Sequence, residues 1–150
     1  MSELKDKIRA DLKEAMKAKE KERTGTIRML LAAIQTAETE GTKHEVDDAE
    51  IQKIIAREIK KRRESAEIYQ SNGREDLASQ ELTEAEILEG YQPTQLTDEE
   101  LASLVDATVA DLNASSMAQM GAVMKEVTTR AEGRADGKRL SAAVKARLGQ

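Results

Sequence analysis

The feature that most constrains the fold is the recurrence of aliphatic residues at three- and four-residue spacing in a chain almost without aromatic side chains. The sequence has no Phe and no Trp, and its two Tyr residues are Tyr69 and Tyr91. Apolar residues spaced in this way line one face of an α-helix, whereas a half-buried strand would alternate apolar and polar residues. A sheet protein of this size would also normally carry aromatic residues. The sequence therefore predicts an all-α protein with an aliphatic core.

The first 92 residues contain four segments with helical spacing, which we predict to form an N-terminal helical domain. The first two are separated by a break between residues 19 and 26, where we expect Gly25 to weaken the helix. The third is the longest; Asp47 or Asp48 can cap it, and it ends at residues 71–73. Its predicted buried residues are Ile51, Ile55, Ile59, Ala66 and Tyr69. The fourth runs from about residue 74 to residue 89.

Residues 90–100, "GYQPTQLTDEE", indicate a domain boundary. Pro93 cannot continue a helix, and Thr97 with Glu100 has the spacing of a capping box for the next helix. We predict a linker at residues 93–95 and a C-terminal domain of three short helices at residues 96–150. The apolar residues of these helices are Leu101, Leu104, Val105, Val109 and Leu112, then Met117, Met120, Met124 and Val127, then Leu140, Val144 and Leu148.

The segment "GRADGK", residues 133–138, could be a phosphate-binding loop or a turn between two helices. A phosphate loop has four residues between its glycines and a Ser or Thr after the lysine. Here three residues separate Gly133 from Gly137, and Arg139 follows the lysine. We therefore predict a turn in which Gly133 stops one helix and Asp136 caps the next. Arg134 would project beside the amides that open that helix, where an anion can bind.

The net charge of −5 is unevenly distributed along the chain. Residues 113–150 hold seven basic and three acidic residues, so the remainder carries the negative charge. Lys138 and Lys145 are seven residues apart and share one helical face, and Lys125 likewise lies away from its apolar stripe. These lysines form either a solvated face or a docking surface for an anionic partner. Gly121 costs a helix about 1 kcal/mol relative to alanine, and we expect it to permit close helix packing, or else approach of a partner backbone.

The long third helix carries a second basic group with Glu58 and Glu64 interspersed. Its outer basic residues are Lys53, Arg57, Lys60, Lys61 and Arg63. The mixed signs favour a solvated face over an RNA track. Arg62 falls on the apolar side, and we expect its stem to snorkel toward water.

Nothing in the sequence indicates a catalytic, metal or cofactor site. The chain has no cysteine, which excludes thiol nucleophiles and zinc-thiolate sites. His44, the one histidine, lies in a polar turn without an evident partner. The acidic clusters at residues 47–50 and 97–100 occupy first turns of helices, where carboxylates serve as caps. With no run of about 20 apolar residues to cross a membrane, and no apolar signal core, we expect a cytoplasmic protein.

The C-terminal motifs resemble those of the GatB/YqeY family. They are "GAVMK" (121–125), "GRADGK" (133–138) and "VK..L" (144–148). The segments at residues 62–78 and 91–101 also resemble YqeY proteins. The resemblance implies a helical N-terminal domain and a three-helix tail. In the GatB subunit of the glutamine-dependent aspartyl/glutamyl-tRNA amidotransferase, that tail helps to hold the tRNA while other domains do the chemistry.

Carried over by position, the resemblance implies that Lys125, Arg134, Lys138 and Lys145 face RNA. Ala122 departs from the family pattern, where a basic residue is common, and Arg139 replaces a usually apolar residue. The leading hypothesis is a non-catalytic accessory protein that binds tRNA or another structured RNA.

The alternative hypothesis is a helical adaptor for a tRNA-handling enzyme, such as a tRNA-dependent amidotransferase or an aminoacyl-tRNA enzyme. Met117, Met120 and Met124 would then form a contact strip, because methionine adapts to varied surfaces. Their helical spacing equally fits a place in the core.

Overall fold

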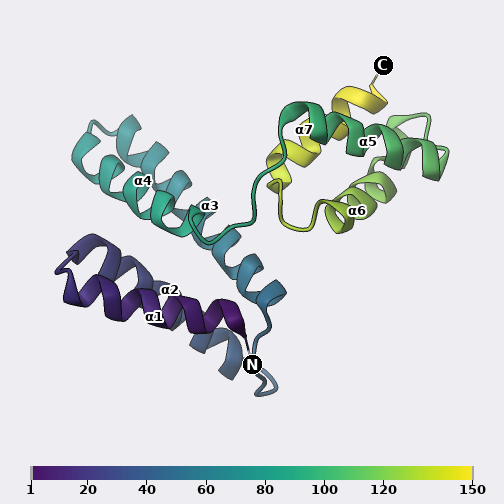
Figure 1. Cartoon of the computed structure of the whole chain (residues 1–150). Helices are drawn as coiled ribbons and strands as arrows, with labels where there is room; N and C mark the ends of the chain where they lie inside the picture. Colours follow the sequence, from purple (N-terminus) through teal and green to yellow (C-terminus); the bar gives the residue numbers. More distant parts are fainter. Residues whose placement is uncertain (1, 150) are drawn as a thin grey trace. The chain divides into compact units, whose positions relative to one another are not determined.

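The computed structural model describes residues 2–149, which form seven α-helices and one short 3-10 helix, with no strand in that range (Figure 1). The elements are α1 (Glu3–Lys17), α2 (Lys21–Thr39), α3 (Asp48–Ser71), α4 (Glu75–Glu89), α5 (Asp98–Leu112), η1 (Met117–Gln119), α6 (Met120–Ala131) and α7 (Gly137–Leu148). The prediction of an all-α protein is confirmed. The chain divides into two compact units, Met1–Gln92 and Pro93–Gln150.

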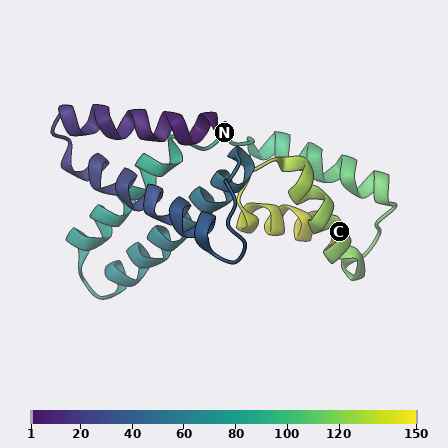
Figure 2. The same cartoon turned by 90° about the horizontal axis from the view of Figure 1, so that it is seen from below.

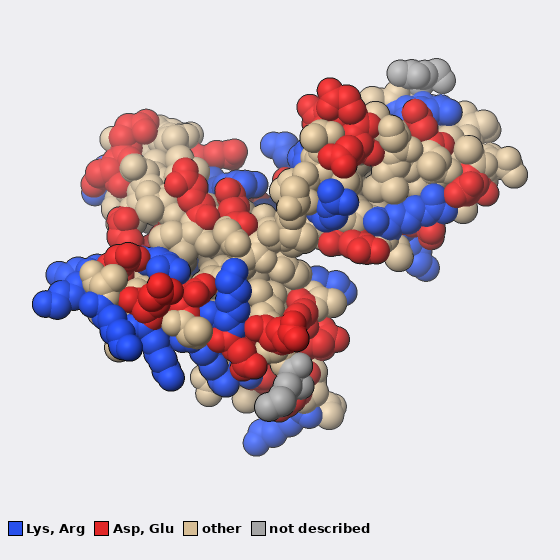
Figure 3. Space-filling view, viewed as in Figure 1, with Lys and Arg blue, Asp and Glu red and all other residues tan. Residues whose placement is uncertain are grey.

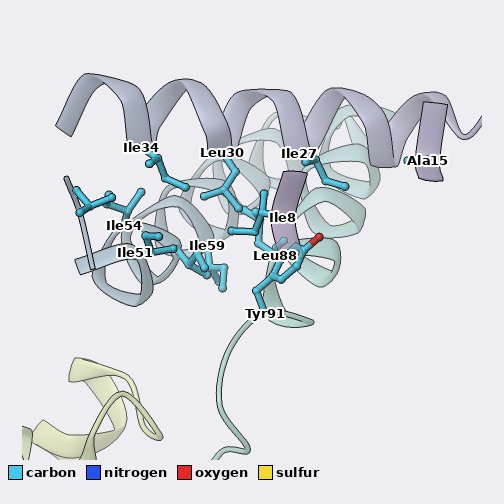
Figure 4. Packing of buried hydrophobic residues seen from close by; sticks show 13 residues of the cluster. Ile8, Ala15, Ile27, Leu30, Ile34, Ile51, Ile54, Ile59, Leu88 and Tyr91 are labelled. Carbon is cyan, nitrogen blue, oxygen red and sulfur yellow. The ribbon is translucent and has the colours of Figure 1, made fainter. Parts of the chain in front are cut away.

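The first unit consists of two helical hairpins, α1 with α2 and α3 with α4 (Figures 1 and 2). The 24-residue α3 connects them, since it packs against all three other helices of the unit. Figure 4 shows the aliphatic core that these helices share. Its most deeply buried large side chains are Ile8, Ile27, Leu30, Ile34, Ile51, Ile55 and Leu88. Burying one such side chain contributes about 1.5–3 kcal/mol, so this cluster is the main stabilising feature of the unit.

Two side chains tie the end of the first unit back to its helices. The Tyr91 hydroxyl donates a hydrogen bond of 2.6 Å to Asp11 Oδ2 on α1. The Gln52 amide on α3 donates to the Tyr91 carbonyl oxygen at 2.6 Å. Tyr91 therefore adds a ring to the core and keeps its polar end hydrogen-bonded, as a buried tyrosine requires.

Side-chain caps fix where several helices begin. Asp47 accepts a hydrogen bond of 2.8 Å from the Glu50 amide at the start of α3. The neighbouring Asp48 instead accepts from the Ser2 hydroxyl, and Ser2 caps α1, so the first turns of α1 and α3 are joined. Both bonds of the predicted capping box between Thr97 and Glu100 are present, which confirms that prediction.

Gly25 lies inside α2 and does not interrupt the helix. The chain turns earlier, at Lys19, whose φ of 58° is in the left-handed region. The break predicted between residues 19 and 26 is therefore present at the start of that range, and Gly25 does not end the helix, since the adjacent Thr26 and Ile27 are fully buried. Their burial outweighs the roughly 1 kcal/mol that a helical glycine costs.

Arg62 is buried, with 5% of its surface exposed. We expected its side chain to extend toward water, and it does not. Its Nη1 lies 3.1 Å from Glu58 Oε1, and its Nε lies 3.3 Å from Glu84 Oε2 on α4. Its Nη2 contacts the Met29 sulfur on α2 at 3.6 Å. Its charge is balanced by the carboxylates of Glu58 and Glu84 inside the unit, and the side chain thereby links α2, α3 and α4.

We predict that Arg62→Met lowers the free energy of unfolding by about 3 kcal/mol. This is near the lower end of the range for removing one partner of a buried ion pair, because Glu58 and Glu84 keep some contact with water. Urea unfolding followed by circular dichroism measures the loss. Lys61→Met is the matched control, since 75% of the Lys61 side chain is exposed, and we expect a change within about 0.5 kcal/mol. Equal effects of the two substitutions would contradict a structural role for Arg62.

His44 has two partners that the sequence did not reveal. Its Nε2 lies 2.8 Å from Glu50 Oε2, and its Nδ1 lies 3.0 Å from the Thr42 carbonyl oxygen. A protonated imidazole donates from both nitrogens, so these two acceptors favour the charged form. The hydrogen bond to Glu50, followed by that to Thr42, raises the pKa of His44 above 6.5.

We predict that this contact makes the first unit more stable at acidic than at alkaline pH. The contribution of His44 is complete below its unfolded-state pKa of about 6.5, and it is lost as pH rises through the higher folded-state pKa. NMR titration of the imidazole and unfolding experiments across this pH range measure the effect. Glu50→Gln should return the pKa of His44 toward its ordinary value, whereas Glu40→Gln, in the same loop region, should not. An unshifted pKa in the unmodified protein would refute the interaction.

Candidate nucleic-acid interface

The second unit packs α5, α6 and α7 around its own aliphatic core. The buried residues include Leu101, Val105, Val109, Val123, Val127, Leu140, Val144 and Leu148. This packing fixes which faces of α6 and α7 point outward. Those outward faces carry the lysines that the sequence analysis singled out.

The turn between α6 and α7 is built from two left-handed residues and a cap. Glu132 and Gly133 have φ values of 49° and 77°, which ends α6 and reverses the chain. Asp136 accepts a hydrogen bond of 2.7 Å from the Arg139 amide and so caps α7. The first turn of α7 thus already holds an anionic group of its own, which reduces the room for an external anion at its amides.

Residues 94–96 are bonded to this turn. The Leu96 amide donates to the Arg134 carbonyl oxygen at 2.7 Å, and the Arg134 Nε donates to the Thr94 carbonyl oxygen at 2.8 Å. The segment predicted as a linker therefore meets the second unit through backbone and side-chain hydrogen bonds. Arg134 therefore stabilises this turn, in addition to the RNA contact that the resemblance implies.

The other three arginines of the second unit also bond to neighbouring groups. Arg130 lies 2.9 Å from Asp111 on α5, and Arg147 lies 2.9 Å from Asp106 on the same helix. Arg139 donates to the Leu96 carbonyl oxygen at 2.8 Å. The forked guanidinium suits such contacts, and together they attach α6 and α7 to α5 and to the segment before it.

The three lysines of the second unit behave differently. Lys125, Lys138 and Lys145 are exposed, and none of their side chains makes a hydrogen bond or ion pair with any residue from 2 to 149. Lys138 and Lys145 lie away from the buried Leu140 and Val144 on α7. The positive charge that remains available to a partner is therefore carried by lysine.

Gly121 does not allow close packing between helices, contrary to our expectation. It is exposed in the first turn of α6, and a Cβ placed there would meet no atom of the described chain within 4 Å. The same is true of Gly137, directly before Lys138. Gly121 and Lys125 are one helical turn apart and share a face, so each glycine leaves open space beside a lysine.

A shallow groove of about 540 Å³ lies between the start of α5 and the end of α6. Arg130 and Arg134 line it together with Glu99 and Glu100. Hydrogen bonds from Thr97 lower the pKa of Glu100, so this carboxylate stays ionised near neutral pH, 3.9 Å from the Arg134 guanidinium. Charges of both signs make the groove a poor site for a phosphate.

The methionines predicted as a contact strip are divided by the structure. Met117, in η1, is 45% exposed, whereas Met120 and Met124 are partly buried against the core. Over residues 2–149 no group of three His, Asp or Glu side chains is placed to hold a metal ion. In the same range no helix has the length and apolar character needed to cross a membrane.

Three fungal proteins similar to this chain are each named altered inheritance of mitochondria protein 41, mitochondrial. The Eremothecium gossypii protein is 33% identical over 110 residues, which cover 72% of this chain and 60% of that protein. The Pyrenophora tritici-repentis protein is 32% identical over 132 residues, which cover 86% and 71%. The Clavispora lusitaniae protein is 30% identical over 123 residues, which cover 80% and 71%. Across such relatives the matched region covers between 43% and 71% of the relative's own length.

These names contradict the expected cytoplasmic location, since they assign the relatives to mitochondria. The expectation rested on composition and on the absence of an apolar signal core. Mitochondrial transit peptides are amphipathic and rich in Arg and not apolar, so the absence of an apolar signal core does not distinguish the two compartments.

A family model described as Yqey-like protein matches residues 5–148, which include both helical units. The match takes in the segments whose resemblance to this family was noted from the sequence, namely the third helix, the boundary near Pro93 and the turn at residues 133–138. The chain belongs to the YqeY-like family.

Proposed function

We propose that this chain is a non-catalytic RNA-binding accessory protein whose second unit contacts the phosphates of structured RNA, foremost tRNA. The observation that carries the proposal is the contrast between arginine and lysine in this unit. Arg130, for example, bonds to Asp111 and Glu126, whereas Lys125, Lys138 and Lys145 are exposed and unpaired within the described chain. Unpaired cations on a rigid surface displace counterions from a polyanion, which is the main source of affinity for nucleic acid.

The open space beside two of these lysines supports the proposal. A phosphodiester backbone needs room to approach an ammonium group closely. Gly121 provides that room one turn before Lys125, and Gly137 provides it beside Lys138. Arg134 acts as a positioning residue, because its bond to the Thr94 carbonyl holds the turn that presents Lys138.

The absence of exposed aromatic rings on this unit determines the kind of recognition. Neither Phe, Trp nor Tyr occurs after residue 91, so bases cannot stack on side chains here as they do in many single-strand binders. Contacts to phosphates and to the shape of a folded RNA remain. The resemblance to the GatB tail supports tRNA as that RNA, and a tRNA-dependent amidotransferase or an aminoacyl-tRNA enzyme as a protein with which this chain would work.

We predict that Lys125→Gln/Lys138→Gln/Lys145→Gln weakens binding to a tRNA transcript about tenfold at roughly 50 mM salt. The unmodified protein should lose at least about tenfold in affinity between roughly 50 and 200 mM salt. Removal of three phosphate contacts should reduce the slope of log affinity against log salt by about 2, because each contact contributes about 0.7–0.9. Fluorescence anisotropy with labelled tRNA measures both quantities.

The matched control removes three positive charges from the mixed-sign face of α3, by Lys53→Gln/Arg57→Gln/Lys60→Gln. Glu64 lies 4.0 Å from Lys60, and Glu58 and Glu64 are interspersed along this face. These carboxylates repel phosphates, so we expect less than a twofold effect. If the control weakened binding and the C-terminal variant did not, the assigned lysines would be wrong. Absence of tRNA binding by the unmodified protein at low salt would refute the proposed function itself.

A further inference from the structure

The first 28 residues are basic although the first unit as a whole is acidic. They hold nine Lys or Arg residues and six Asp or Glu residues, whereas residues 29–112 hold eight basic and twenty acidic residues. The local excess of positive charge falls on α1 and on the first half of α2. The net charge of residues 1–112 taken together is negative and so conceals this basic segment. The family resemblance was noted at the C-terminal motifs and does not explain it.

Basic side chains follow one face of α1 at every fourth residue. They are Lys5, Arg9, Lys13 and Lys17. Residues four apart in a helix lie on one face, about 6 Å apart along the axis. Lys5 is neutralised by Glu38 of α2 at 2.8 Å. Arg9, Lys13 and Lys17 are exposed, and none of them makes a side-chain hydrogen bond or a close ion pair with another described residue. Glu38 also attracts Arg9 at longer range.

This face of α1 continues onto the outer face of α2. The Arg28 Nη2 lies 3.7 Å from the Met16 sulfur, so the two helices meet at this edge as they do at the Lys5–Glu38 pair. Lys21 lies seven residues before Arg28 and shares its helical face. Lys and Arg side chains project together from the lower edge of this hairpin in Figure 3, which has the same view as Figure 1.

We define the α1–α2 basic surface as Arg9, Lys13, Lys17, Lys21 and Arg28. The exposed residues that follow Arg28 on the outer face of α2 are uncharged: Met29, Ala32, Gln35, Thr36 and Thr39. The exposed acidic residues beside the surface are Asp6, Glu14, Glu20 and Glu22, four against five cations, and Glu20 lies 3.4 Å from Arg23. The surface is therefore positive on balance and bordered by Gln35, Thr36 and Thr39, which can hydrogen-bond to phosphate oxygens.

We infer that the α1–α2 basic surface binds the phosphate backbone of double-stranded RNA. The inference rests on the proposed function, because it takes RNA as the ligand and adds a second place of contact. Consecutive cations on α1 are separated by a distance comparable with that between consecutive phosphates of one strand. The surface has no ring on which a base could stack, which favours paired over unpaired RNA.

A membrane fits this surface less well than RNA does. Binding in the headgroup region requires large apolar side chains such as Trp, Phe or Leu beside the basic residues. The large apolar side chains exposed beside these cations are two methionines: Met16, whose sulfur contacts Arg28, and Met29, whose sulfur contacts Arg62. No Trp, Phe or Leu is exposed among them. Phosphates held at fixed positions along a duplex match fixed cations on a helix, and an RNA duplex also presents 2′-hydroxyls to neighbouring polar side chains.

The test uses the full chain with Arg9→Gln/Lys13→Gln/Lys17→Gln and a labelled RNA duplex of about 16 base pairs, the length that a double-strand binder spans. Glutamine keeps helix propensity close to that of lysine and arginine, and circular dichroism verifies the fold. We expect about a tenfold loss of affinity at low salt and a salt slope smaller by about 2. The α3 variant Lys53→Gln/Arg57→Gln/Lys60→Gln removes the same charge and should change affinity less than twofold.

The outcomes separate this inference from the proposed function. Weaker binding in the α1 variant supports the inference, even where the variant of Lys125, Lys138 and Lys145 binds normally and the C-terminal assignment fails. Weaker binding in the C-terminal variant alone overturns the inference and leaves the proposed function standing. No duplex binding by the unmodified protein overturns the inference, as does binding to phosphatidylcholine/phosphatidylserine vesicles that depends on Arg9, Lys13 and Lys17 while RNA binding does not.

Discussion

Packing of aliphatic side chains against α3 is the constraint on which the first unit depends. Ile51, Ile55 and the other β-branched residues of the core have few rotamers in a helix, so their positions are well defined without large rings. Apart from Tyr91, this core has no aromatic ring that could contact several helices at once. Polar links complete the attachment, and Arg62 between α2, α3 and α4 is the most deeply buried of them.

In the second unit, arginine and lysine have different roles: the arginines hold the helices together, and the lysines stay exposed. Each arginine reaches a carbonyl or carboxylate of another segment, as Arg139 does with Leu96 and Asp98. A planar guanidinium makes several directed hydrogen bonds at once, whereas an ammonium on a flexible stem holds one position less well. Within the described part of this unit, lysine is thus the cation that is left unpaired. That division gives the proposed RNA contacts their physical basis.

The sequence was sufficient for features determined by near neighbours. Helical spacing predicted the helices, and Thr97 with Glu100 is a contact three residues apart. Prediction from the sequence failed where a residue's interaction partner lies on a different helix. Glu84 is 22 residues from Arg62, and only the α3–α4 hairpin brings the two together. Gly121 was misjudged for the same reason, because its surroundings depend on where other helices lie. The basic face of α1 was visible as a four-residue period but was hidden by summing charge over 112 residues.

Two weak basic surfaces in one chain have a consequence that neither has alone. Each proposed surface has between three and five exposed cations and would engage few phosphates, and screening by salt would reduce that contribution steeply. When one surface is bound, the other is held at a high effective concentration near the same RNA, provided that the geometry allows both to reach it. A polyanion long enough to meet both surfaces would then bind more tightly than a short one of equal charge density. Length selection of this kind needs no base readout, which fits two proposed surfaces that contain no aromatic residue.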